Sequence, residues 1–295
     1  MPEIAGLAAG KVVSNREPER HVAAKSPDKA AKKSDLKPRV LSALVMIPCA
    51  LYALYSGGML WAALIALSLA AMSAEWADIV FGKNTTRAPK LLFVAATMVI
   101  FVLCTWHTAQ LASAVALGTG LLVFGAGAAV LGRPAKWAGF GLSYLSIAAI
   151  ALYWLRAQTG QTGMILVFFL LIVVWATDIG AYFAGRKIGG PKIFPAISPN
   201  KTWSGSIGGV LSATACAACI SLVFMPNTPL LLVCMLAIGL SIVAQAGDAF
   251  ESAMKRIFKV KDSGSIIPGH GGVLDRLDAL LLAAPVMAAF IWVNS

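Results

Sequence analysis

The chain has 295 residues, of which 59% are hydrophobic and 13% are charged, and its mean hydropathy is +0.79. Soluble domains carry about a quarter charged residues, so this composition excludes an ordinary soluble protein and indicates an integral membrane protein. The net charge of +11 does not indicate nucleic-acid binding, because the basic residues flank apolar runs instead of gathering on one soluble surface.

The first 39 residues differ from the rest of the chain. They hold nine Lys or Arg and five Asp or Glu, and they contain no apolar core followed by a cleavage site. Residues 40–80, in contrast, contain only Glu75 and Asp78 as acidic residues. We therefore expect a basic, disordered cytoplasmic tail at 1–39, joined to a transmembrane catalytic domain at 40–295.

Apolar runs of the length needed to cross a bilayer, about 20 residues, follow one another along the catalytic domain. They lie near 40–56, 59–80, 91–107, 111–131, 138–155, 163–184, 203–225, 229–247 and 272–293. The predicted fold is thus all-α and polytopic, with about nine transmembrane helices. The first run is short and the break at 107–110 is weak, so eight or ten spans remain open.

The distribution of Lys and Arg predicts the orientation of these spans. With nine spans and the N-terminus inside, only Arg156 of the 24 Lys and Arg residues falls in an outside loop. Because basic residues are enriched in cytoplasmic loops, we expect a multi-pass protein of the inner (cytoplasmic) membrane with its N-terminus and active site in the cytoplasm. Two long, Gly- and Pro-rich cytoplasmic loops, 185–202 and 248–271, are candidates for irregular backbone around a ligand.

Outside the tail, all eight acidic residues lie close to the predicted cytoplasmic side. Asp275 and Asp278 open the last apolar run at i and i+3, so one helical face can present both to a cation. Oxygen ligands of this kind favour magnesium. Helix capping is the alternative; it suits Asp275 but not Asp278, one turn deeper, where an isolated charge is expensive and indicates function.

Asp248 and Glu251 form a second i, i+3 pair at the end of the eighth run. Beyond them an apolar stripe (Phe250, Met254, Ile257, Phe258) opposes a basic one (Lys255, Arg256, Lys259), which predicts an amphipathic helix in the membrane interface. A helix that only anchors the protein in the membrane interface would explain the apolar stripe but not the acidic pair. Glu75 and Asp78 flank a tryptophan at the inner end of the second run, and we interpret them as snorkelling at the interface.

Three further segments could contact a ligand. Asp178 lies eight residues before Arg186, about 12 Å along a helix, and either serves function or pairs with Arg186 or Lys187. A phosphate could be bound by the hydroxyl groups and the lysine of the segment Ser198-Pro199-Asn200-Lys201-Thr202. Gly269-His270-Gly271-Gly272 precedes a helix whose first N–H groups could do the same, although His270 could equally staple the loop.

The stretch from Ser252 to Asp278 resembles the signature of the phosphatidate cytidylyltransferases, also called CDP-diacylglycerol synthases. That pattern runs S-x-apolar-K-R, K-D, then H-G-G-apolar-x-D-R-x-D. The residues that match it are Ser252, Lys255, Arg256, Lys261, Asp262, His270, Gly271, Gly272, Asp275, Arg276 and Asp278. The segments DIGAYFAGR, SPNKTW and GDAFES are also similar to the family. This chain departs from the family at one position after KTW, where it has Ser204 and the family often carries an acid or amide. The resemblance covers residues 38–295.

The resemblance implies transfer of the cytidylyl group of CTP to phosphatidate, giving CDP-diacylglycerol and pyrophosphate in phospholipid synthesis, with Mg²⁺. The expected metal ligands, for one or two divalent ions, are Asp248, Asp275 and Asp278. Together with Lys255 and Arg256 they form the expected catalytic set. Expected substrate-binding residues are Asp178, Ser198, Asn200, Lys201, Glu251, His270, Gly271, Gly272 and Arg276. The expected partners are CTP, phosphatidate and membrane lipids; a monovalent cation and a homodimer are left open.

Two other functions fit parts of the sequence. Another membrane phosphotransferase acting on a lipid phosphate would also place aspartates at the cytoplasmic face, but the aspartate spacing of the CDP-alcohol enzymes is absent. A lipid or ion transporter would use intramembrane aspartates as a relay, and would place charges near the middle of the membrane. Here the charges gather at one face, which favours chemistry at the surface.

Overall fold

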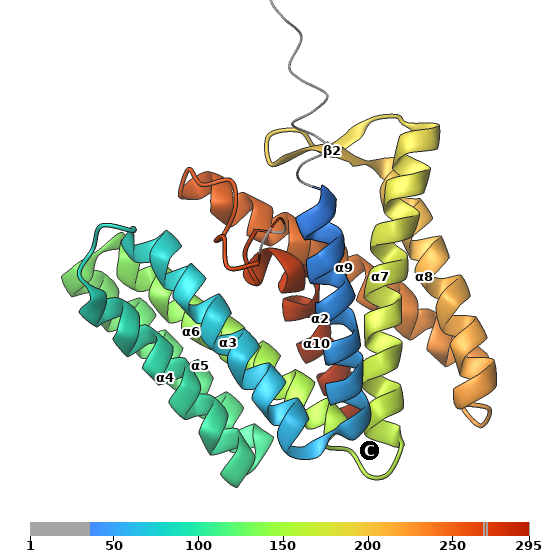
Figure 1. Cartoon of the computed structure of the whole chain (residues 1–295), viewed down its shortest axis with the longest axis horizontal. Helices are drawn as coiled ribbons and strands as arrows, with labels where there is room; N and C mark the ends of the chain where they lie inside the picture. Colours follow the sequence, from blue (N-terminus) through green and yellow to red (C-terminus); the bar gives the residue numbers. More distant parts are fainter. Residues whose placement is uncertain (1–35, 268, 270, 295) are drawn as a thin grey trace, which may run out of the picture.

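The structure is a computed structural model that describes residues 36–267, 269 and 271–294. Most of the predicted tail, and His270, lie outside the described residues. The described part contains nine helices: α2 (Leu36–Ser56), α3 (Gly58–Phe81), α4 (Arg87–Trp106), α5 (Ala109–Leu131), α6 (Arg133–Arg156), α7 (Thr162–Ile188), α8 (Trp203–Phe224), α9 (Leu230–Ile257) and α10 (Leu274–Val293). Their order is drawn in Figure 1.

Each of the nine apolar runs forms a helix, which confirms an all-α, polytopic membrane fold. Seven of the helices are long and apolar enough to cross a membrane, whereas the apolar parts of the other two, Val40–Ser56 and Ala109–Gly125, are shorter. The exact number of spans therefore stays a prediction.

Small residues let the helices approach closely. A Cβ on Gly209 of α8 would lie 2.8 Å from the carbonyl oxygen of Thr177 on α7, and a Cβ on Gly139 of α6 would lie 2.5 Å from that of Gly120 on α5. The two helix pairs α7–α8 and α5–α6 are consequently packed backbone against backbone, with α10 contacting both α6 and α9.

The loops that carry the predicted site residues gather at one end of the bundle, the upper side of Figure 1. The loop after α7 forms a short antiparallel hairpin, β1 (Lys192–Phe194) and β2 (Ser198–Thr202), instead of irregular backbone alone. Thr202 then caps α8, because its side chain accepts a hydrogen bond from the Gly205 N–H. Lys201 is thereby held at a hairpin end that is fixed to a helix.

Arg156, the exception to the basic pattern, lies at the end of α6 and binds the C-terminal end of α2. Its Nε donates to the Leu54 carbonyl at 2.6 Å and its Nη2 to the Tyr55 carbonyl at 3.0 Å. Carbonyls at a helix C-terminus lack partners within the helix and favour a cation. A local structural role thus explains this arginine.

The amphipathic segment after Asp248 is helical as predicted, and it forms the end of α9, which continues without a break to Ile257. Part of the apolar stripe packs on protein, whereas Ile257 is 42% exposed. Phe250 lies 5.3 Å from Phe140 and 5.5 Å from Tyr144, between ring centroids, and Met254 is fully buried. A 28-residue helix is about 42 Å long, so α9 extends beyond the hydrocarbon layer and carries Asp248 and Glu251 with it.

Candidate active site

The loop before α10 is held by a carboxylate from a distant helix. Glu75 of α3 is 3% exposed, and its Oε1 and Oε2 accept the backbone N–H groups of Val273 and Leu274, both at 2.9 Å. The Ser263 hydroxyl lies 3.1 Å from Oε2. Glu75 therefore caps α10 from outside, and interface snorkelling is the wrong interpretation for it. Asp78 does lie at the surface, where it pairs with Lys90 at 2.7 Å.

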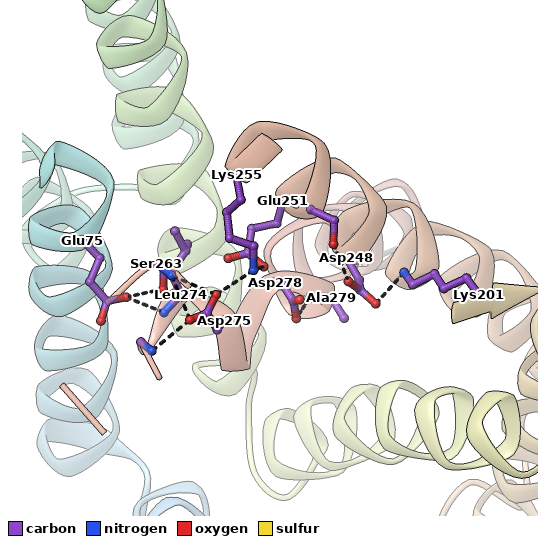
Figure 2. A network of polar contacts seen from close by, with 12 residues as sticks. Glu75, Lys201, Asp248, Glu251, Lys255, Ser263, Leu274, Asp275, Asp278 and Ala279 are labelled. Carbon is purple, nitrogen blue, oxygen red and sulfur yellow. Dashed lines mark hydrogen bonds and ion pairs between the residues drawn. The ribbon is translucent and has the colours of Figure 1, made fainter. Parts of the chain in front are cut away.

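Asp275 holds the same loop from within α10. Its carboxylate accepts the N–H groups of Ser263 and Gly272, each at 3.0 Å, and the ammonium of Lys255 at 2.7 Å. Both of its oxygens are thus engaged (Figure 2). The N–H groups of Gly272, Val273 and Leu274 all donate to carboxylates. These three N–H groups are therefore already paired, and phosphate binding at the start of this helix stays a prediction.

Lys255 joins this loop to the second acidic pair. Its Nζ lies 3.4 Å from Glu251 Oε2 and 2.7 Å from Asp275 Oδ1, and the three side chains are largely buried. Glu251 itself is fully buried, and neither of its oxygens accepts a hydrogen bond of good geometry from the part of the chain that the structure describes. Asp278 lies close enough to Asp248 and Glu251 for the carboxylates to interact electrostatically.

The hairpin contributes the second lysine. Lys201 Nζ lies 2.5 Å from Asp248 Oδ2, which brings β2 against α9. Ser198 and Asn200 lie on the same strand. Asp178 of α7 is exposed and within electrostatic range of Asp248, Asp278 and Lys201. Five predicted residues from three elements (Lys201, Asp248, Glu251, Lys255 and Asp278) therefore share one site.

Close backbone contact fixes the two acidic helices relative to each other. A Cβ on Gly247, next to Asp248, would lie 2.8 Å from the carbonyl oxygen of Asp278. Alanine cannot be accommodated there unless α9 and α10 separate. The glycine thus sets the distance between the helices at the level of their carboxylates.

The remaining predicted residues lie around this network. Arg256 and Arg276 are exposed, and Arg256 Nε donates to the Ile197 carbonyl beside the hairpin at 3.5 Å. Gly271 has φ +86°, and its carbonyl accepts the Ile267 N–H at 2.9 Å, which closes the loop on itself. His270 lies outside the described residues.

The predicted metal ligands are not arranged as a closed three-residue site. Within residues 36–267, 269 and 271–294, no group of three or more His, Cys, Asp or Glu side chains is placed to hold a metal ion. Asp275 is turned toward the loop, whereas Asp248 and Asp278 interact electrostatically. Magnesium is usually bound through one or two carboxylates together with substrate phosphates and water, so the pair Asp248 and Asp278 still suits it.

Glu75 and Ser263 are the residues that sequence reasoning missed. The sequence does contain one signal for Glu75, because an acidic residue within the apolar run SAEWADIV indicates function. Its partners, however, lie almost 200 positions further along the chain, and no local pattern identifies them.

Comparison with known proteins matches residues 37–294 to the model of the cytidylyltransferase family. The chain belongs to this family. Among its cytidylyltransferase relatives, the phosphatidate cytidylyltransferase of Brucella suis biovar 1 (strain 1330) is 41% identical over 269 residues, covering 87% of this chain and 93% of the relative. The phosphatidate cytidylyltransferase of Pseudomonas aeruginosa is 34% identical over 276 residues, covering 87% and 97%. That of Bacillus subtilis is 44% identical over 127 residues, covering 43% and 47%.

Proposed function

We propose that this cytidylyltransferase transfers the cytidylyl group of CTP to phosphatidate and releases CDP-diacylglycerol and pyrophosphate. The relatives that align over most of the chain carry the name phosphatidate cytidylyltransferase. The observation that carries the proposal is the network of Figure 2, which gathers the carboxylates of Asp248, Glu251, Asp275 and Asp278. Among the described residues, ion pairs join three of them to two lysines, Lys201 and Lys255. A bound divalent cation would offset the surplus of negative charge, which supports a site for a metal ion and a polyphosphate.

The reaction needs charge neutralisation more than it needs a base. A phosphate monoester loses its second proton near pH ~6, so an oxygen of phosphatidate can attack the α-phosphorus of CTP directly. The bond from that phosphorus to the bridging oxygen of the β-phosphate breaks, and pyrophosphate takes the electron pair. The main obstacle is repulsion between two polyanions, which cationic groups in the site reduce.

Asp248 and Asp278 are the residues that would hold Mg²⁺, which when bound supplies positive charge and polarises a phosphoryl oxygen. Lys201 would then exchange its contact with Asp248 for one with a phosphate, and the exposed Arg256 and Arg276 would face the remaining charge. Ser198, Asn200, Asp178 and Gly271 would contact the substrates around this position. Glu251, Lys255, Asp275 and Gly272 act as positioning residues, since their charges or hydrogen bonds are directed at one another.

The site lies at the end of the bundle that carries the basic loops (Figure 1). The enrichment of Lys and Arg at that end supports a cytoplasmic orientation, which is where CTP is available. Phosphatidate would enter sideways from the adjoining leaflet. The bacterial relatives support the inner membrane as the location.

The experiment that tests the function uses purified protein, CTP labelled on the cytosine, phosphatidate and Mg²⁺ in detergent micelles. The expected result is chloroform-soluble label, an equal amount of pyrophosphate, and no product when phosphatidate is replaced by diacylglycerol. A folded protein that gives no lipid-soluble label under these conditions would reject the proposal.

A further inference from the structure

We infer that Glu75 is a positioning residue for cytidylyl transfer: it anchors the loop 263–273 and the start of α10, and thereby sets the place of the site's carboxylates. This inference rests on the proposed function. It concerns a residue of α3, a helix that contributes none of the expected substrate or metal contacts.

The anchor replaces a helix cap that the sequence of α10 lacks. The N-cap residue, Val273, has no side chain that could accept a hydrogen bond. Glu75 accepts the Val273 and Leu274 N–H groups instead, and its negative charge faces the positive end of the helix dipole. Since the carboxylate is 3% exposed, water cannot substitute for these partners.

The anchor is itself rigid. The next residue, Trp76, is fully buried, and its indole N–H donates to the Trp137 carbonyl of α6 at 3.0 Å. On the loop side, a Cβ on Gly264 would lie 2.6 Å from Glu75 Oε1, and one on Gly272 would lie 2.5 Å from Oε2. The two glycines allow the backbone to close around the carboxylate, so the loop position is set by α3.

Two short connections link Glu75 to the carboxylates of the site. Leu274, which donates to Glu75, directly precedes Asp275, and Asp275 is paired with Lys255 of α9. One turn further along α10, Asp278 lies within electrostatic range of Asp248. A displacement of about 1 Å in such groups can reduce a rate about 100-fold, so release of the anchor is expected to impair catalysis without removing any substrate contact.

The test is Glu75→Gln, compared with Asp78→Asn. Glutamine has a similar shape, but its amide presents one acceptor and one donor, so either Val273 or Leu274 loses its acceptor. Asp78 lies one turn away on the same helix at the surface, where it pairs with Lys90, and its variant controls for a charge lost from α3.

Three readouts are measured in both variants. In Glu75→Gln, amide hydrogen exchange in peptides covering 263–274 accelerates about 10-fold or more, while peptides of α7 and α8 keep wild-type rates. The kcat falls about 10- to 100-fold. The Mg²⁺ concentration for half-maximal activity rises, which a mere loss of folded protein would not cause. Asp78→Asn keeps wild-type values in all three.

Wild-type kcat and Mg²⁺ dependence in Glu75→Gln would overturn the inference, whether or not exchange accelerates. A lower kcat with unchanged exchange in 263–274 would also overturn it. If Glu75→Gln does not accumulate, Ser263→Ala replaces it, because that change removes only the 3.1 Å hydroxyl contact with Glu75. We expect smaller changes in the same directions for Ser263→Ala. Wild-type values of Ser263→Ala in all three readouts would refute the inference. If the wild-type protein makes no product, the proposed function is rejected. Faster amide exchange of residues 263–274 in Glu75→Gln would even then show that Glu75 holds this loop.

Discussion

Lys255 of α9 and Asp275 of α10 form an ion pair of 2.7 Å between side chains that are 15% and 8% exposed. The same ammonium lies 3.4 Å from Glu251. One lysine thus neutralises a carboxylate on each of the two helices that carry the acidic residues of the site. Because neither carboxylate is well hydrated, the lysine is essential to the arrangement.

Lys255→Met should therefore destabilise the protein strongly. Removal of one partner from a buried ion pair costs about 3–5 kcal/mol, and activity should fall together with stability. Lys90→Met is the matched control, because Lys90 is 16% exposed, much like Lys255, but its partner Asp78 is 45% exposed. The carboxylate left behind is hydrated, so the loss of stability should be smaller, about 0–1 kcal/mol. Thermal unfolding in detergent measures both. Equal losses of stability in the two variants would show that Lys255 has no special role.

The contact between α9 and α10 gives a second prediction. Gly247→Ala should reduce both stability and activity, because its Cβ would meet the Asp278 carbonyl oxygen at 2.8 Å. Gly239→Ala on the same helix has no atom within 4 Å and should be neutral or stabilising by up to ~1 kcal/mol, the difference in helix propensity. Unfolding temperatures and labelled-CTP turnover distinguish them; an active, stable Gly247→Ala protein would contradict the close packing.

The orientation can be measured with single cysteines. After replacement of the five native cysteines, Asn84→Cys and Thr159→Cys place thiols in exposed loops at opposite ends of the bundle. In intact cells an impermeant maleimide should label Thr159→Cys and should reach Asn84→Cys only after the cells are broken. The reverse pattern would place the site outside.

The sequence was sufficient for the helices but not for the contacts of each carboxylate. Hydrophobic run length locates the helical segments because the bilayer imposes it. It does not show that Asp275 turns to the Ser263 and Gly272 N–H groups, since that depends on how a loop closes. The amphipathic stripe beyond Asp248 was correctly recognised as a helix face, but periodicity cannot show that aromatic side chains of α6 contact Phe250 in this stripe.

Arg156 and Glu75 illustrate the same limit at opposite ends of the molecule. Charge counting alone left Arg156 as an exception, and its hydrogen bonds to the end of α2 explain why a cation is retained there. The position of Glu75 beside a tryptophan at the inner end of the second apolar run likewise led to its assignment to the membrane interface. Only the tertiary contacts show that it caps another helix.

The central claim is that Asp248 and Asp278 hold the divalent cation that joins CTP to phosphatidate, and its most direct test is Asp278→Ala in the labelled-CTP assay across a Mg²⁺ titration. Asp78→Ala serves as the control, and the unfolding temperature is recorded for both. We predict that Asp278→Ala remains folded, forms no chloroform-soluble product at any Mg²⁺ concentration, and resembles wild-type protein treated with a chelator. Near wild-type product formation by Asp278→Ala, with an unchanged Mg²⁺ dependence, would contradict the account.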